Sequence, residues 1–161
     1  MSEFILKPSI SESEKNFREK IGQSKWDELK IKFFAKSNGY CYSCGYIPED
    51  KDELAFHVEK WDGVDPDTTE LFLICKGCHA IKHFDSCVKN NWIVLCNSSM
   101  SQEELVRLCR DRNKLTKVFN ERKIILISKT PEKYLEEIRD IDYDKKLDKV
   151  KVVFRKEFSW K

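Results

Sequence analysis

The chain has 161 residues, of which 36% are charged and 40% apolar, and its net charge is +2. This length fits one domain with extensions, and the apolar content is that of a chain with a folded core. No stretch approaches the roughly 18 consecutive apolar residues of a membrane helix, and the amino terminus lacks the pattern of a signal peptide. We therefore expect a cytoplasmic or nuclear protein without a membrane partner, whose seven cysteines are metal ligands or buried thiols rather than disulfides.

Helical signals dominate the first 40 residues. A capping box at Ser11 and Glu14 predicts a helix to about residue 21, and Gly22 follows it. A second helix is expected from Ser24 to the stop signal Asn38-Gly39. Three of its apolar residues share one face: Trp26, Leu29 and Phe33. Trp26, Phe33 and Phe34 are expected to be core residues rather than platforms on which bases stack.

Shorter elements are expected in the rest of the chain. Between residues 41 and 97 they are a tight knuckle at 41–47, strands at 54–59 and 71–75 around a turn-rich loop at 62–69, a short helix at 77–84 and a strand at 92–96. Beyond residue 97 they are a helix at 101–119 that begins with a capping box, a strand at 123–127 and a short helix at 131–139. Residues 149–154 are expected to form an edge strand or a tail that pairs with a partner. The order predicts an α+β fold in three segments: N-terminal helices at 1–40, a metal-clamped core at 41–97 and a basic α/β extension at 98–161.

Four cysteines form two C-x2-C pairs separated by thirty residues: Cys41, Cys44, Cys75 and Cys78. A two-residue gap lets both thiolates of one turn reach the same ion, and two such turns complete the four-sulfur set that zinc prefers in structural sites. The alternative is two unrelated pairs of buried thiols. We predict a structural zinc site, whose binding adds folding free energy to a module with a thin core. The other three cysteines lack this spacing and are expected to be buried thiols.

All three histidines lie within a 27-residue window that overlaps the cysteine pairs. His79 follows Cys78 directly, and His83 comes four residues later, so one helix face presents both imidazoles. Two imidazoles at that spacing can share a divalent metal ion. His57 lies on the first predicted strand. The alternative interpretation is that these side chains cap or pack against the zinc knuckle and the core.

The run from residue 55 to residue 83, AFHVEKWDGVDPDTTELFLICKGCHAIKH, together with CYSCG at 41–45, resembles the ββα-metal (HNH) endonuclease family with a four-cysteine zinc clamp. The resemblance covers about a quarter of the chain. It implies that His57 is the general base that activates water. It also implies that His79 and His83 hold a catalytic Mg²⁺, Mn²⁺ or Zn²⁺ ion, which stabilises the scissile phosphate.

Two positions depart from the pattern of the family. Phe56 stands where the family usually has an Asp or His metal ligand before the base, and Glu59, on the same strand face as His57, is a candidate substitute. Glu70 stands where the family has an Asn that orients the base or braces the loop. We therefore take His57, Glu59 and Glu70 as the candidate catalytic residues.

Positive charge is concentrated outside this core. Residues 41–84 carry nine Asp and Glu against four Lys, whereas residues 85–161 carry 18 Lys and Arg against 13 Asp and Glu. The candidates for phosphate contact lie on the predicted helix at 101–119; a plain solvated helix surface is the alternative. They are Arg107, Arg110, Lys114 and Lys117.

These patterns favour a small HNH-type endonuclease that hydrolyses phosphodiester bonds in DNA, with a structural zinc ion and a second, catalytic Mg²⁺ or Mn²⁺ ion. The alternative is a catalytically inactive zinc-binding module of the same fold that binds nucleic acid or a protein partner. Phe56, Glu70 and the negative charge of the core favour this second interpretation.

Overall fold

The computed structural model describes residues 6–9, 13–36, 39–61, 63–64, 70–127, 133 and 150–160. The described residues form two compact units: residues 13–79 with Trp160 make up the first, and residues 6–9 with 80–159 the second. None of the described helices has the length and apolar character needed to cross a membrane. The fold is α+β, as the sequence predicts.

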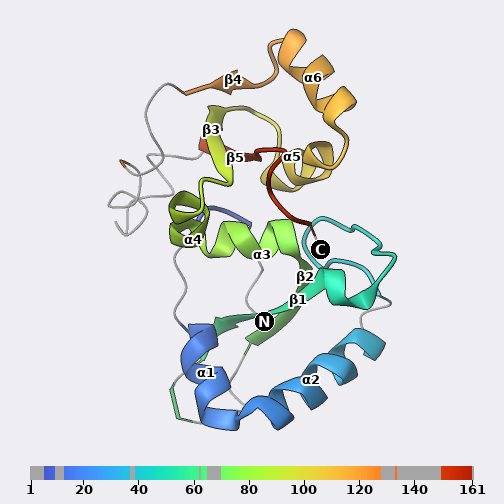
Figure 1. Cartoon of the computed structure of the whole chain (residues 1–161), viewed down its shortest axis with the longest axis vertical. Coiled ribbons are helices and arrows are strands. Elements are labelled where there is room, and N and C mark those ends of the chain that lie inside the picture. Colours follow the sequence, from blue (N-terminus) through green and yellow to red (C-terminus); the bar gives the residue numbers. More distant parts are fainter. Residues whose placement is uncertain are drawn as a thin grey trace. The chain divides into compact units, whose positions relative to one another are not determined.

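The first unit is built on an antiparallel hairpin. Two helices pack on the hairpin, α1 against β1 and α2 against β2 (Figure 1). The chain then passes from β2 directly into α3, so the local order of elements is strand, strand, helix. The elements are α1 (Ser13–Ile21), α2 (Gln23–Lys36), the 3₁₀ turn η1 (Lys51–Glu53), β1 (Leu54–Lys60), β2 (Glu70–Cys75) and the start of α3 (Lys76–Lys82).

An aromatic cluster fills the space between the helices and β1. Phe56 of β1 is 3% exposed, and its ring lies 5.5 Å from that of Trp26 and 4.9 Å from that of Phe33, both edge-to-face. Phe17 of α1 meets Trp26 and Trp61 in the same way, at 6.3 Å and 5.4 Å. Edge-to-face pairs at these distances are favourable beyond the area they bury. The prediction that Trp26 is a core residue is confirmed, whereas Phe33 and Phe34, also predicted to lie in the core, are half-buried.

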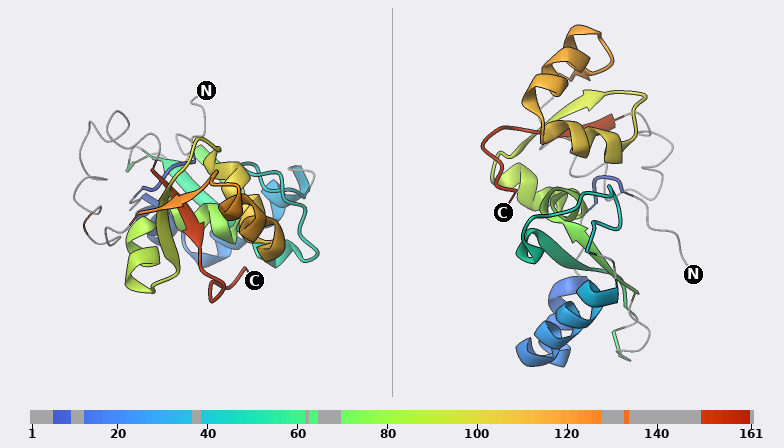
Figure 2. Two further views of the ribbon diagram at one scale, coloured as in Figure 1. Left: turned by 90° about the horizontal axis from the view of Figure 1, so that it is seen from above. Right: turned by 90° about the vertical axis from the view of Figure 1, so that its right-hand side faces the viewer.

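The second unit contains a three-stranded antiparallel sheet in the order β4-β3-β5 (Figure 2). Helix α5 packs on β5, and α6 packs on α5. Strand β5 lies at one edge of the sheet, which confirms the prediction of an edge strand there. The elements are α4 (Phe84–Lys89), β3 (Ile93–Asn97), α5 (Gln102–Cys109), α6 (Arg112–Asn120), β4 (Ile125–Leu126) and β5 (Val150–Phe154).

Two helices differ from their predicted extents. The helix expected over 101–119 is two helices, because the chain turns at Arg110 and Asp111 and the Asp111 side chain accepts the N–H of Lys114 as the cap of α6. The helix expected over 77–84 ends at Lys82, and α4 begins at Phe84. The capping box at Ser101 is confirmed, since its Oγ accepts the N–H of Glu104 at 3.1 Å.

A buried side-chain amide joins α5 to β5. Gln102 is 3% exposed; its Nε2 donates to the carbonyl of Val152, and its Oε1 accepts the N–H of Val152, both at 2.8 Å. The amide therefore satisfies the backbone groups of Val152 as a neighbouring strand would. Parts of four predicted features lie outside the described residues: Ser11, Asn38, residues 65–69 of the loop and most of residues 131–139.

Candidate metal centre and histidine pair

The structure brings the four cysteines of the two C-x2-C pairs together. Their side chains are 0–4% exposed, and their four sulfur atoms lie within 4.8 Å of one another. The sulfurs of Cys44 and Cys75 are 3.7 Å apart. Four sulfurs placed at about 2.3 Å from a central ion, at the corners of a tetrahedron, are about 3.8 Å apart. The tetrad is therefore compatible with a structural zinc site, and its cysteines are free thiols rather than disulfides.

Backbone N–H groups point at the sulfurs of this tetrad. Cys41 Sγ accepts the N–H of Cys75 at 3.2 Å and that of Cys44 at 3.4 Å, and Cys75 Sγ accepts the N–H of Cys78 at 3.5 Å. Hydrogen bonds among the four thiols lower the pKa of Cys41 and Cys75 and raise that of Cys44 and Cys78. A thiolate is the form that binds a metal ion, and N–H donors favour it. The hydrogen bonds around the tetrad thus suit a bound cation.

Local backbone geometry sets the first pair of cysteines in place. The N–H of Gly45 donates to the carbonyl of Cys41 at 3.0 Å, and the φ of +80° at Gly45 turns the following chain back, so that the carbonyl of Tyr46 accepts the N–H of Cys41 at 2.8 Å. The N–H of Tyr42 donates to the carbonyl of Leu73 at 3.0 Å, which attaches this knuckle to β2. Because β2 leads into the second pair, this hydrogen bond and the one from Cys75 to Cys41 Sγ hold both knuckles at the same end of the hairpin.

The second pair spans the junction between β2 and α3, with Gly77 between its two cysteines. A Cβ atom on Gly77 would lie 2.3 Å from Cζ3 of Trp160, closer than two such atoms can approach. The indole of Trp160 therefore covers this knuckle at a position where only glycine leaves room. Nothing in the local sequence around either residue indicates this contact, since the two are 83 positions apart in the chain.

His57 forms an ion-pair geometry with a carboxylate on its own strand. Its Nε2 lies 2.9 Å from Oε2 of Glu59, and the histidine is 1% exposed. The register of β1 shifts between Val58 and Lys60, so Glu59 is the extra residue of a β-bulge. Bulges redirect side chains and are common beside active sites. An ionised carboxylate can only accept a hydrogen bond, so beside an ionised Glu59 a neutral His57 has its proton on Nε2 and its lone pair on Nδ1.

His79 of α3 faces His57 and has a carboxylate partner of its own. The two imidazole rings are 5.6 Å apart, and Nε2 of His79 lies 3.2 Å from Oε1 of Glu14 in α1. Glu59 and Glu14 thus contact the same nitrogen atom, Nε2, of the His57 and His79 rings. This is the arrangement by which a carboxylate fixes the tautomer of a metal-binding histidine. The sequence predicts Glu14 only as part of a helix cap, and it gives no signal for this pairing across 65 positions.

The other candidate positions of the core lie after α3, at the start of β2 and in the aromatic cluster. His83 follows α3 and is the N-cap residue of α4, with φ = −122° and ψ = 59°, so it has left the helical conformation. Glu70 begins β2 opposite Lys60, whereas His57 stands opposite Phe72. Phe56 lies in the aromatic cluster described above, so this position supplies packing to the core and no metal ligand.

The basic candidates lie on either side of the turn between α5 and α6. Arg107, Lys114 and Lys117 are exposed, and Arg110, the C-cap residue of α5, is half-buried. Nζ of Lys114 lies 4.0 Å from Asp111. The prediction that these candidates lie on one helix is wrong, because the chain turns at Arg110 and Asp111. Lys114 and Lys117 do lie three positions apart on α6.

The other three cysteines are buried in the second unit, as the sequence predicts. Burial raises the pKa of Cys87 to about 12, with a further contribution from the charge of Asp85. Burial also raises the pKa of Cys96 to about 12 and that of Cys109. These thiols stay protonated at neutral pH and are poor metal ligands and nucleophiles.

Comparison of the chain with protein-family models, with curated proteins and with solved structures finds no match. The assignment of function therefore rests on the residues and geometry of this chain.

Proposed function

We propose that this protein is an HNH-type endonuclease that hydrolyses phosphodiester bonds in DNA with a divalent metal ion. The observation that carries the proposal is the position of His57 on β1, held by Glu59 at 2.9 Å and facing His79 of α3 at 5.6 Å, beside a tetrad of cysteines. The strand, strand, helix order and the bulge at Glu59 support it. We assign zinc to the tetrad as a structural ion.

The chain's own residues would divide the chemistry among them. Nδ1 of His57 takes a proton from water, and Glu59 stabilises the imidazolium that forms, because its carboxylate already holds Nε2. His79 and His83 are the residues that would hold Mg²⁺ or Mn²⁺, which supplies charge stabilisation to the phosphate. Glu70, at the start of β2, is the remaining candidate catalytic residue.

Contact with DNA is assigned to the second unit. Lys114 and Lys117 on α6, together with Arg107, present exposed positive charge. Such side chains bind the phosphate backbone without reading its sequence, so affinity should fall steeply as salt is added. The negative balance of residues 41–84 means that the contacts with phosphate must come largely from outside that segment.

One observation favours a second function, that of a catalytically inactive zinc-stabilised module that binds nucleic acid or a protein. The side chain of His57 is 1% exposed, and a general base must come within hydrogen-bond reach of its water. A histidine buried against Glu59 and His79 serves equally as a satisfied polar core residue.

Nicking of supercoiled plasmid DNA by the zinc-loaded chain in Mg²⁺ or Mn²⁺ separates the two functions. The endonuclease predicts nicked circles, and their rate of formation should fall at least about 100-fold in His57→Ala, since general bases contribute about that much or more. Zinc content and the far-ultraviolet circular dichroism of the variant should match those of the parent chain. No nicking by a folded, zinc-loaded chain rejects the endonuclease and leaves the binding module.

A further inference from the structure

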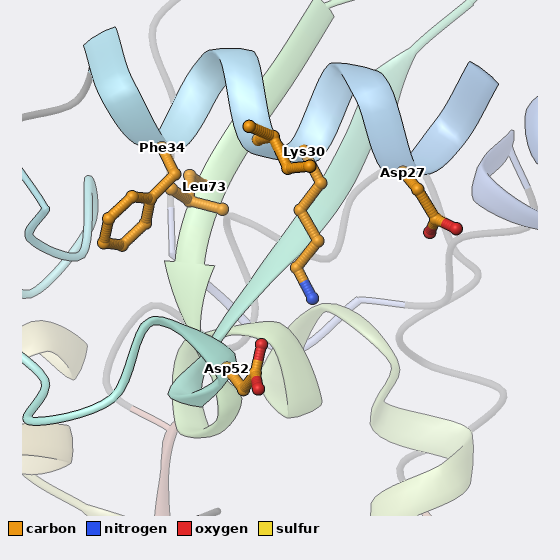
Figure 3. A pocket seen from close by; sticks show the side chains of 6 residues that line it. Asp27, Lys30, Phe34, Asp52 and Leu73 are labelled. Carbon is orange, nitrogen blue, oxygen red and sulfur yellow. The ribbon is translucent and has the colours of Figure 1, made fainter. Parts of the chain in front are cut away.

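A pocket of about 280 Å³ lies in the first unit, and none of the cysteines and histidines of the candidate site is among its lining residues (Figure 3). Helix α2 forms its roof, and η1 and β2 form the rest. Figure 3 shows Lys30 extending from α2 across the pocket toward Asp52 of η1, with Phe34 and Leu73 at one end and Asp27 at the other. The six lining residues are Asp27, Lys30, Ile31, Phe34, Asp52 and Leu73.

The apolar wall of this pocket contains one exposed and one buried side chain. Ile31 lies on the roof helix and is 66% exposed, whereas Leu73, in β2, is 3% exposed. An apolar wall that runs from a buried leucine out to an exposed isoleucine is a typical contact for an incoming apolar side chain. The volume is at the lower limit of pockets that enclose a small molecule, and it fits one or two side chains of a longer ligand.

The charges around the pocket are mostly negative. Asp52 also lines a neighbouring hollow of about 170 Å³ with Glu49, Asp50 and Glu53. Oε2 of Glu53 accepts the N–H groups of Glu49 and Asp50, so this carboxylate holds the turn in shape. The side chains of Glu49, Asp50 and Asp52 are exposed. Among the lining residues that the structure describes, the two hollows carry the carboxylates of Asp27, Glu49, Asp50, Asp52 and Glu53 and the ammonium of Lys30.

We propose that this pocket docks a segment of a partner protein in which a large aliphatic or aromatic side chain lies next to lysine or arginine. The apolar side chain enters between Ile31, Phe34 and Leu73, and the basic side chains lie along the carboxylates of η1. Charge complementarity selects this occupant over an acidic one and over the phosphate backbone of a nucleic acid. The proposal does not depend on the endonuclease assignment, because it uses none of the same residues.

The test is fluorescence polarisation of the full zinc-loaded chain with three synthetic ten-residue peptides that carry the same label. One contains Leu and Phe among lysines, the second has glutamates in place of the lysines, and the third has serines in place of Leu and Phe. We expect the first peptide to bind at least about tenfold more tightly than either of the others, since both apolar burial and charge contribute. Equal binding of the first and third peptides, or of the first and second, or no binding of the first overturns the proposal.

Two variants, at Ile31 and Asp52, test whether the peptide binds at this pocket, and a third, at Ile125, is the control. Ile31→Ser should weaken the first peptide about tenfold, whereas Ile125→Ser should leave it unchanged, because Ile125 is similarly exposed, at 60%, but lies on β4 of the second unit. Asp52→Lys should shift the preference toward the glutamate peptide. All three positions are exposed, so the fold should tolerate the changes. Equal loss in Ile31→Ser and Ile125→Ser overturns the proposal. Self-association in sedimentation that Ile31→Ser abolishes also overturns it, in favour of a second copy of the chain as the occupant.

Discussion

The indole of Trp160 occupies the space that a Cβ atom on Gly77 would fill, at 2.3 Å from its Cζ3. One residue lies at the end of the chain and the other between two cysteines of the tetrad. This contact joins the carboxyl-terminal segment to the knuckle at the start of α3, so the packing around the candidate zinc site depends on both.

Gly77→Ala should destabilise the first unit by about 1–3 kcal/mol, because the new methyl group displaces Trp160. Trp160→Ala should itself lower the free energy of unfolding, but in the Trp160→Ala chain the further change Gly77→Ala should lower it little. Gly45→Ala is the matched control: it should be destabilising because of φ = +80°, and Trp160→Ala should not relieve it, since nothing lies within 4 Å of a Cβ there. Urea unfolding of the parent chain, the two single variants and the double variant gives the coupling energy between Gly77 and Trp160. The same set with Gly45→Ala in place of Gly77→Ala gives the control value. Additive costs of Gly77→Ala and Trp160→Ala would contradict the contact.

The purified chain should hold one zinc ion, measured by atomic emission against protein concentration. Cys44→Ser should lose that ion, because one ligand of the buried tetrad is removed, whereas Cys96→Ser should retain it. A chelator should unfold the first unit as it removes the metal, and acid should do the same, since protons compete with the ion for the thiolates. Retention of zinc in Cys44→Ser and its loss in Cys96→Ser would place the ion elsewhere.

Glu14→Gln should weaken binding of Mn²⁺ at the proposed histidine site about 10–100-fold, because the carboxylate that holds Nε2 of His79 is lost. This prediction rests on the proposed function. Glu19→Gln, on the exposed side of the same helix, is the control and should leave the affinity unchanged. Paramagnetic broadening of the histidine resonances by Mn²⁺ reports the affinity without any nuclease assay. Equal affinities of the two variants would mean that Glu14 plays no part in metal binding.

The stability of the second unit should fall in alkaline solution. The pKa values of Cys87 and Cys96 are raised from 9.0 to about 12, so the folded state favours the neutral thiols. Their contribution is fully present below about pH 9, where the unfolded thiols are also protonated, and is lost as pH rises from 9 toward 12. The urea midpoint of the Cys87→Ala, Cys96→Ala chain should therefore decline less steeply over that range than the parent's. Parallel declines would show that other groups determine the alkaline loss.

Most elements of the first unit follow from local sequence. The apolar spacing of Trp26 and Phe33 predicts α2, and β-forming residues around His57 predict β1, because these signals act over a few positions. The spacing of the cysteines likewise predicts that the four thiols form a tetrad. The helix over 101–119 was predicted too long, since Asp111 caps a new helix where periodicity alone continues the old one.

The sequence by itself determined which chemistry is present: four thiols in two knuckles, three histidines near them and basic residues beyond residue 85. Only the tertiary structure decided which side chains meet. Glu14 reaches His79, Gln102 pairs with Val152 and Trp160 covers Gly77, each across 50 or more positions. Local propensity records the conformation of a segment, whereas these contacts depend on how the segments pack, and packing is set by burial over the whole chain.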